Sequence, residues 1–135
     1  MAIKIEEVEG IGPVYAEKLV AAGVKTDVEM LAKAGSAKGR TELSAKTGIT
    51  VALILKWTNH VDLMRIDGVG PQFAELLEAT GVDTVKELAQ RNAANLAVKM
   101  GEVNKQKKLA GTAPAESQVA DWIRQAEKLP AMISY

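Results

Sequence analysis

Two short runs of sequence decide the fold: Gly10-Ile11-Gly12-Pro13 near the start of the chain and Gly68-Val69-Gly70-Pro71 in the middle. An acidic residue precedes each run, and an Ala-Glu-x-Leu pattern follows it, at residues 16–19 and 74–77. The copies share an offset of 58 residues that holds as far as Val24 and Val82. An internal duplication of this kind predicts a fold built from two similar units.

The composition indicates a small folded protein with no global electrostatic preference. The chain has 135 residues, 47% of them hydrophobic, and its 17 basic residues balance its 17 acidic residues. A net charge of zero provides no overall field toward nucleic acids or anionic membranes, so electrostatic binding would have to come from local patches. The chain has no cysteine, which excludes disulfides and thiolate chemistry.

The sequence contains no signal for secretion or membrane insertion. The first residues lack the basic and apolar pattern of a signal peptide. The longest uninterrupted aliphatic run, Val51 to Leu55, is far too short to cross a bilayer. We therefore expect a cytoplasmic protein with no membrane partner.

The hydrophobic spacing predicts helices along almost the whole chain. Pro13 suits the first turn of a helix that Gly23 ends. Residues 1–9 fit either a short extended arm or a single helical turn. The later helices are expected to begin at capping side chains, namely Thr26, Ser36, Thr50, Thr84 and Asn92.

Apolar positions in these helices indicate which faces point inward. In the helix after Thr26 we expect Val28 and Leu31 to face the core. Leu31 then corresponds to Leu88 at an offset of 57 rather than 58. The two copies are therefore predicted to differ by one residue at the entrance of this helix.

Trp57 and Trp122 are predicted to lie in the last helix of each copy, but they are 65 residues apart rather than 58. The second copy therefore contains an insertion of about seven residues, which we place within 105–115, where glycine and proline indicate a loop. Both tryptophans are predicted to anchor cores rather than to stack on bases. Tyr15 and Phe73 directly follow the hairpins and are predicted to fasten them to neighbouring helices.

The glycine turns resemble the helix-hairpin-helix motif, which has alanine four residues and leucine seven residues past the second glycine. Residues 5–130 as a whole resemble a family of small proteins of unassigned function, built from tandem helix-hairpin-helix units. The resemblance includes the stretches 57–65 and 81–88. It implies an all-α fold of two fused helix-hairpin-helix (SAM-like) repeats with pseudo-two-fold symmetry.

The repeats also predict how the chain is divided. Residues 1–65 form the first repeat, including a connecting helix over 49–65. Residues 66–135 form the second repeat. We expect the two repeats to share one compact domain.

The hairpins are suited to hold phosphate groups. A glycine turn lets a phosphate approach the backbone because no Cβ intervenes, and the first N–H groups of the following helix point outward at the positive end of its dipole. Such contacts do not read sequence. By resemblance, the two hairpins would straddle a minor groove, one on each strand. The expected nucleic-acid-binding residues are Gly10, Ile11, Gly12, Val14, Tyr15, Gly68, Val69, Gly70, Gln72 and Phe73, with Lys18, Lys38 and Arg40 as supporting charges.

Two basic stretches accompany the repeats. The first contains Lys33, Lys38, Arg40 and Lys46, and the second Lys99, Lys105, Lys107 and Lys108. They could follow a phosphate backbone, but a solvated helix face is the usual explanation of such a run.

The second hairpin is the less favourable of the two for an anion. Asp67, Glu75 and Glu78 are acidic, and Arg65 is the one basic residue close in sequence. The acidic residues around the second hairpin and the zero net charge of the chain favour an alternative, in which the hairpins are structural turns and the helices dock a protein. The expected partner is therefore the phosphate backbone of DNA or RNA, or else another protein.

No residues indicate catalysis or metal binding. His60 is the only histidine, and Asp62, two positions later, points off another helix face. A zinc site needs at least three suitable ligands. We therefore expect a non-enzymatic module with no catalytic residues, no metal and no cofactor.

Overall fold

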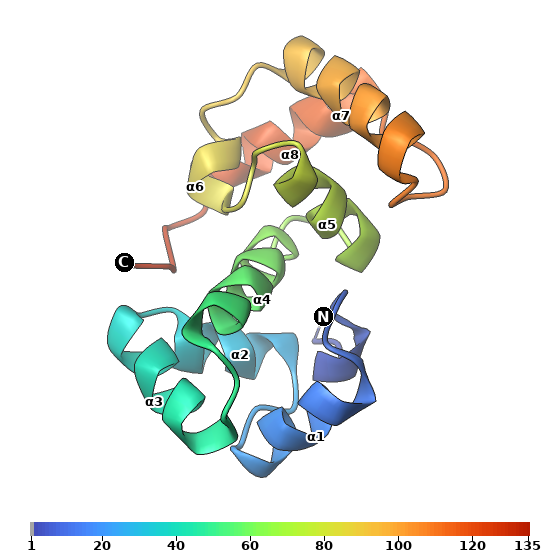
Figure 1. The fold of residues 1–135 in the computed structure, drawn as a ribbon. Helices are drawn as coiled ribbons and strands as arrows, with labels where there is room; N and C mark the ends of the chain where they lie inside the picture. The colour runs from blue at the N-terminus through green and yellow to red at the C-terminus, as the bar shows by residue number, and fades with distance from the viewer. Residues whose placement is uncertain (1) are drawn as a thin grey trace. The chain divides into compact units, whose positions relative to one another are not determined.

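The computed structural model describes residues 2–135 as an all-helical chain (Figure 1). Within that range no β-strand forms, and only an isolated bridge joins Lys4 to Thr26. The all-α prediction is confirmed. The elements are the 3-10 turn η1 (Ile5–Glu7) and the helices α1 (Gly12–Ala21), α2 (Asp27–Ala34), α3 (Ala37–Thr47), α4 (Val51–Leu63), α5 (Pro71–Ala79), α6 (Val85–Leu88), α7 (Ala93–Lys107) and α8 (Glu116–Lys128).

The chain divides into two compact units. The first runs to Asp62 and also contains residues 132–135, whereas the second runs from Leu63 to Ala131. The boundary thus lies close to the predicted one after residue 65, but the C-terminal tail belongs to the first unit. The shared domain and the pseudo-two-fold symmetry stay predictions.

Each unit has a hydrophobic core centred on one tryptophan. Trp57 is 1% exposed and Trp122 is 2% exposed. The ring of Tyr15 lies 5.1 Å from that of Trp57, and the ring of Phe73 lies 5.2 Å from that of Trp122, with interplanar angles of 58° and 55°. The tryptophans therefore anchor the two cores, and Tyr15 and Phe73 fasten the hairpins to them, as predicted.

The backbone of the hairpin is hydrogen-bonded in the same way in both units. In the first unit the Val8 N–H donates to the Ile5 carbonyl at 3.2 Å, and the Ile11 N–H donates to the Val8 carbonyl at 3.1 Å. The bonds at an offset of 58 are Ile66 to Leu63 and Val69 to Ile66, both 3.1 Å. Residues 5–7 therefore form a helical turn, which is one of the two alternatives predicted for the N-terminal residues.

The predicted threonine caps of α2 and α6 form. Thr26 and Thr84 each accept a hydrogen bond from the N–H three residues later, both at 3.2 Å. The Glu29 carboxylate accepts from the N–H of Lys25, and the Glu87 carboxylate instead pairs with an arginine. The threonine cap is therefore what the two helix starts share, while the glutamates make different contacts.

The predicted inward face of α2 is wrong for Val28, whereas Leu31 does pack against the core of the first unit. Val28 is 61% exposed and Leu31 is only partly buried, whereas Met30 and Ala34 are fully buried. Met30 corresponds to the buried Leu88 at an offset of 58. The one-residue difference between the copies is therefore absent, and the offset of the hairpins continues into this helix.

The first glycine of each hairpin is required by both conformation and packing. Gly10 has φ +88° and Gly68 has φ +99°, a region that side chains with a Cβ rarely adopt. A Cβ at Gly68 would lie 3.0 Å from Trp122 Nε1, and one at Gly10 would lie 3.4 Å from Trp57 Nε1. Glycine therefore lets each hairpin lie against its tryptophan.

We predict that Gly68→Ala lowers the free energy of unfolding by about 1–2 kcal/mol, because alanine must adopt a left-handed conformation there. Gly111→Ala is the control, because Gly111 has no positive φ and a Cβ there would meet nothing within 4 Å. Urea unfolding followed by circular dichroism measures both. Equal midpoints for the two variants would contradict the prediction.

Candidate nucleic-acid interface

The hairpins use some of their N–H groups internally. The N–H groups of Ile11 and Val69 donate within the turn, and both side chains are buried. The expectation that these two residues offer N–H groups to a phosphate is therefore corrected. They hold the turn together, because each apolar side chain enters the core of its unit between two glycines.

Other N–H groups of the hairpins have no acceptor among residues 2–135. They belong to Gly12 and Val14 in the first hairpin and to Gly70, Gln72 and Phe73 in the second. No side chain caps α1 or α5. By contrast, side chains do cap α2, α3, α4, α6 and α7, through Thr26, Ser36, Thr50, Thr84 and Asn92. The start of α8 also lacks a side-chain cap, and there the Ala115 N–H donates to the Gln118 side chain.

The second glycine of each hairpin faces open space. A Cβ built at Gly12 or Gly70 would meet no atom within 4 Å. Their backbones differ, since Gly12 has φ +61° whereas Gly70 is extended, with φ −97°. Gly70 thus has the usual conformation of an N-cap residue, but it lacks the side chain that would occupy the N–H groups of α5.

The comparison with known families covers both hairpins and both tryptophans. Residues 9–129 match the family described as Domain of unknown function (DUF4332). The chain belongs to this DUF4332 family. No curated protein and no solved structure gives a significant match. The predicted membership of a family of unassigned function is therefore confirmed at this level.

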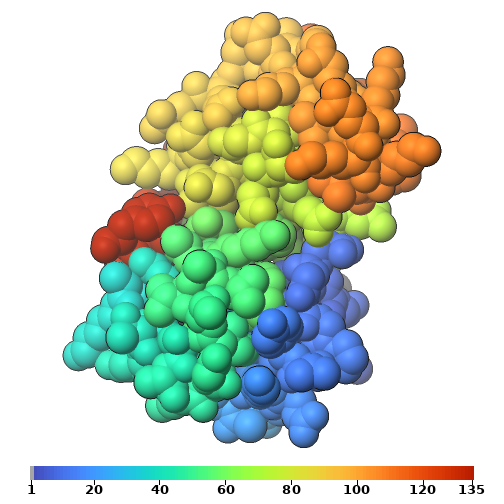
Figure 2. Space-filling model, viewed as in Figure 1, coloured from blue at the N-terminus to red at the C-terminus, as the bar shows by residue number. Residues whose placement is uncertain are grey.

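Arg40 is buried and therefore does not present its charge to a phosphate on the surface of this DUF4332 domain. It is 3% exposed, and its guanidinium donates to the carbonyls of Ala34, Gly35 and Ser134 at 3.0, 3.1 and 2.6 Å. It also lies 5.8 Å from the centre of the Tyr135 ring. Figure 2 shows the C-terminal residues (red) against this cyan part of the chain. Arg40 therefore holds the tail, which corrects its predicted role.

Lys18 on α1 and Lys38 on α3 are both exposed. Each ammonium group is therefore accessible to solvent, as a phosphate contact would require. Neither lysine lines the hollows of about 240, 470 and 580 Å³ on the two units. Their part in binding stays a prediction.

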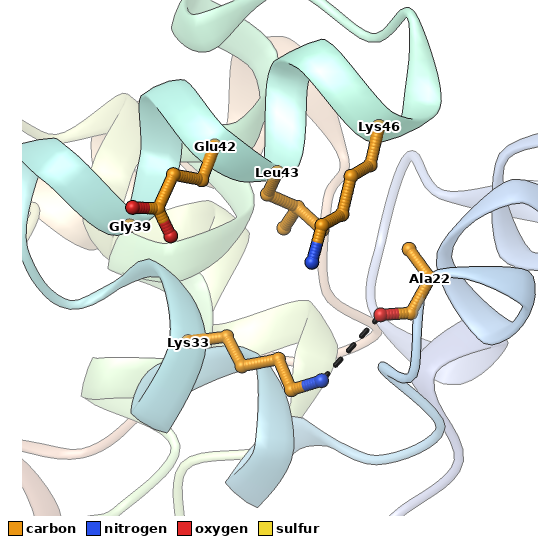
Figure 3. Close-up of a pocket in the computed structure, with 6 residues that line it drawn as sticks. All are labelled: Ala22, Lys33, Gly39, Glu42, Leu43 and Lys46. Carbon is orange, nitrogen blue, oxygen red and sulfur yellow. Dashed lines mark hydrogen bonds between the residues drawn. The ribbon is translucent and has the colours of Figure 1, made fainter.

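A small hollow in the first unit has a mixed charge. Its volume is about 240 Å³, and it is lined by Ala22, Lys33, Gly39, Glu42, Leu43 and Lys46. Figure 3 shows the ammonium groups of Lys33 and Lys46 directed into this space, with Lys33 bonded to the Ala22 carbonyl at 3.4 Å. Glu42 contributes a carboxylate to the same lining.

Lys33 has a structural counterpart in the second unit. Arg91, at an offset of 58, donates to the Gly81 carbonyl at 3.0 Å. Both cations thus bond carbonyls just past the C-terminal end of the hairpin helix, where the helix dipole favours positive charge. This shared contact and the carboxylate of Glu42 make the small hollow a structural feature rather than an anion site.

The second unit has a larger hollow beside its hairpin. Its volume is about 580 Å³, and it is lined by Gln72, Asn104, Lys105, Lys108, Leu109, Ala110 and Gly111. The lining contains two lysines and no carboxylate. Sequence reasoning assigned this lysine run to a solvated face, because nothing in the sequence places it next to Gln72.

Two further classes of site are absent from the described residues. Within residues 2–135 no group of three or more His, Asp or Glu side chains is arranged to hold a metal ion. In the same range, no helix combines the length and apolar character needed to cross a membrane.

Proposed function

We propose that this DUF4332 domain is a non-enzymatic module that binds the phosphate backbone of DNA or RNA without reading sequence. The binding groups are the N–H groups at the starts of α1 and α5, each presented by a helix-hairpin-helix turn. The observation that carries the proposal is that both helices follow glycine turns, lack a side-chain cap and have hairpin N–H groups with no acceptor among residues 2–135.

An uncapped helix start suits an anion for two reasons. Its N–H groups need an acceptor, and the helix dipole places about half a positive charge there. In this chain the open sides of Gly12 and Gly70 leave room for an incoming phosphate oxygen. Because the same turn is built twice, one polymer could occupy both sites, which free phosphate could not.

We predict that labelled single- or double-stranded nucleic acid binds this protein about tenfold or more weakly in 200 mM than in 50 mM salt. In the same assay Gly70→Asp should weaken binding about tenfold at 50 mM. The introduced carboxylate takes the position of an N-cap and occupies the N–H groups of Gln72 and Phe73 itself. Fluorescence anisotropy measures both effects.

Gly70→Asp is a sharp test because it should not harm the fold. Aspartate is a preferred N-cap, so stability should stay equal or rise by a few tenths of a kcal/mol. Ala94→Asp is the charge-matched control, since Ala94 is exposed in the first turn of the capped helix α7. Equal losses of binding in both variants, or none in either, would contradict a role for the hairpin N–H groups.

The alternative function is docking of a protein, and one observation favours it. Val14 and Val20 on α1 are 66% and 43% exposed. Pro13, Ala16 and Val20 also line a mainly apolar hollow of about 470 Å³. Absence of nucleic-acid binding at 50 mM, together with a stoichiometric protein partner lost in Val20→Lys, would favour this function over the first.

A further inference from the structure

We propose that the hollow between the start of α5 and the α7–α8 loop is a phosphate subsite in which Lys105 and Lys108 supply the positive charge. The inference rests on the proposed function in one respect, namely that the phosphate belongs to a nucleic acid. The chemistry of the hollow applies equally to a free phosphate. The experiment below separates these two sources.

The lining of the hollow selects for an anion. Lys105 and Lys108 line it together with Gln72 and Asn104, and no carboxylate takes part. The two hollows of the first unit differ, because one includes Glu42 and the other Glu6 and Glu17. A volume of about 580 Å³ is within the range of pockets that hold small ligands.

A second hollow without a carboxylate, near α6 and α7, does not offer the same charge. It is lined by Gln90, Arg91, Asn92, Asn95, Leu96 and Lys99. Arg91 there forms an ion pair with Glu87 at 3.0 Å and also bonds the Gly81 carbonyl. Its charge is therefore largely committed within the protein.

The end of α7 and the start of the following loop, which carry the two lysines, are held in place by a side chain. The Asn104 amide donates to the Ala110 carbonyl at 3.0 Å and accepts from the Ala110 N–H at 2.9 Å. This pair of bonds closes the segment 105–109. Lys108 ends α7 in a left-handed conformation with φ +52°, the one non-glycine residue with positive φ in the described chain. The backbone that carries both lysines is thus set before any ligand arrives.

The hollow is lined in large part by the segment that the second unit has and the first unit lacks. The glycines of the two copies are offset by 58 residues and the tryptophans by 65, so about seven residues are inserted before α8. The first unit forms its hairpin, its tryptophan contact and its caps without this segment. In the second unit Leu109 and Ala110 of this segment pack on the core, while its lysines lie near a hairpin whose neighbours in sequence are acidic.

The uncapped start of α5 completes the site. Gln72 lines the hollow, and the N–H groups of Gly70, Gln72 and Phe73 have no acceptor among residues 2–135. A phosphate in the hollow would therefore lie beside Lys105, Lys108 and Gln72, the second residue of the uncapped helix α5. The acidic Glu75 lies on α5 but does not line the hollow.

The test compares two charge-matched double variants. Lys105→Gln/Lys108→Asn removes both charges from the hollow, and asparagine tolerates the left-handed conformation at position 108. Lys107→Gln/Lys128→Gln removes two exposed lysines that do not line it. Nucleic-acid binding is measured by anisotropy from 50 to 200 mM salt. Inorganic phosphate and pyrophosphate are titrated by calorimetry, and circular dichroism verifies that each variant folds.

We expect the first double variant to bind nucleic acid about tenfold more weakly at 50 mM salt. Its salt slope should fall by about 1.4–1.8, corresponding to two lost phosphate contacts. The second double variant should change each quantity by less than half as much. Equal effects in both variants would overturn the subsite, because they would reflect net charge alone.

The remaining outcomes separate the subsite from the proposed function. If Gly70→Asp abolishes binding while Lys105→Gln/Lys108→Asn leaves it unchanged, the hairpins bind phosphate and the lysine subsite is overturned. If the native protein binds only phosphate or pyrophosphate, and this requires the two lysines, the subsite is supported and nucleic-acid binding is overturned. If it binds none of these ligands, both proposals are overturned.

Discussion

Replacing Trp122 with alanine is expected to lower the free energy of unfolding of the second unit by about 3–5 kcal/mol. The indole is 2% exposed and belongs to the core of that unit. Its ring centre lies 5.2 Å from that of Phe73, and its Nε1 lies close to Gly68. Its removal therefore leaves a cavity between α8 and the hairpin. For an m-value near 2 kcal/mol/M, the urea midpoint would fall by about 2 M.

The two units can be followed separately because each contains one tryptophan. In Trp122→Ala the remaining Trp57 reports on the first unit, whereas circular dichroism reports on the helices of both. We expect the circular dichroism transition to move to lower urea ahead of the Trp57 emission. Trp122→Phe is the control and should cost less than half as much, because it keeps a ring beside Phe73. A midpoint in Trp122→Ala close to that of the native protein would contradict the assigned anchor.

Local signals in the sequence were sufficient to predict the repeated hairpin. The offset of 58 residues predicts matching turns, and their backbone hydrogen bonds recur at that offset. A threonine caps a helix by accepting a hydrogen bond from the N–H three residues later. Because both groups are close in sequence, the two threonine caps could be predicted. The duplication does not by itself predict that each tryptophan contacts a hairpin aromatic, but it predicts that such a contact in one unit recurs in the other, as observed.

The buried face of α2 could not be predicted, because three of its apolar residues are suitable for the core but do not all lie on one face of the helix. Val28, Met30 and Leu31 are all suitable for a core, and the spacing alone does not choose among them. In the structure the buried face passes through Met30 and Ala34, one turn apart. Packing against the rest of the unit decides the choice, and the sequence of the helix does not contain that information.

The charges of the candidate site were the hardest feature to predict, because they depend on contacts far apart in sequence. Arg40 sits in a basic run that looks solvated, yet it bonds the carbonyl of Ser134, 94 residues away. Lys105 and Lys108 sit in a similar run, and the packing of α7 against α5 brings them beside Gln72. Whether a lysine or arginine faces solvent, a tail or a hollow is a property of tertiary structure.

Gly39→Ala is expected to destabilise the first unit although helix propensity predicts the opposite. Alanine in place of glycine within a helix normally stabilises it by about 1 kcal/mol. Gly39, however, lies in the first turn of α3, where a Cβ would overlap the backbone carbonyl of Lys33 near the end of α2. A backbone atom cannot move aside as a flexible side chain could. The overlap should cost about 3 kcal/mol or more, so the net loss should be about 2 kcal/mol.

Gly101→Ala provides the matched comparison, because the same substitution is made in a helix with room for it. Gly101 lies inside α7, and a Cβ there would meet nothing within 4 Å. We expect Gly101→Ala to raise the free energy of unfolding by up to about 1 kcal/mol, so the two variants should differ by about 3 kcal/mol. Urea unfolding of both, followed by circular dichroism, measures this difference. If both substitutions stabilise the protein equally, then α2 and α3 do not approach as closely as the structure places them, and propensity alone would govern both positions.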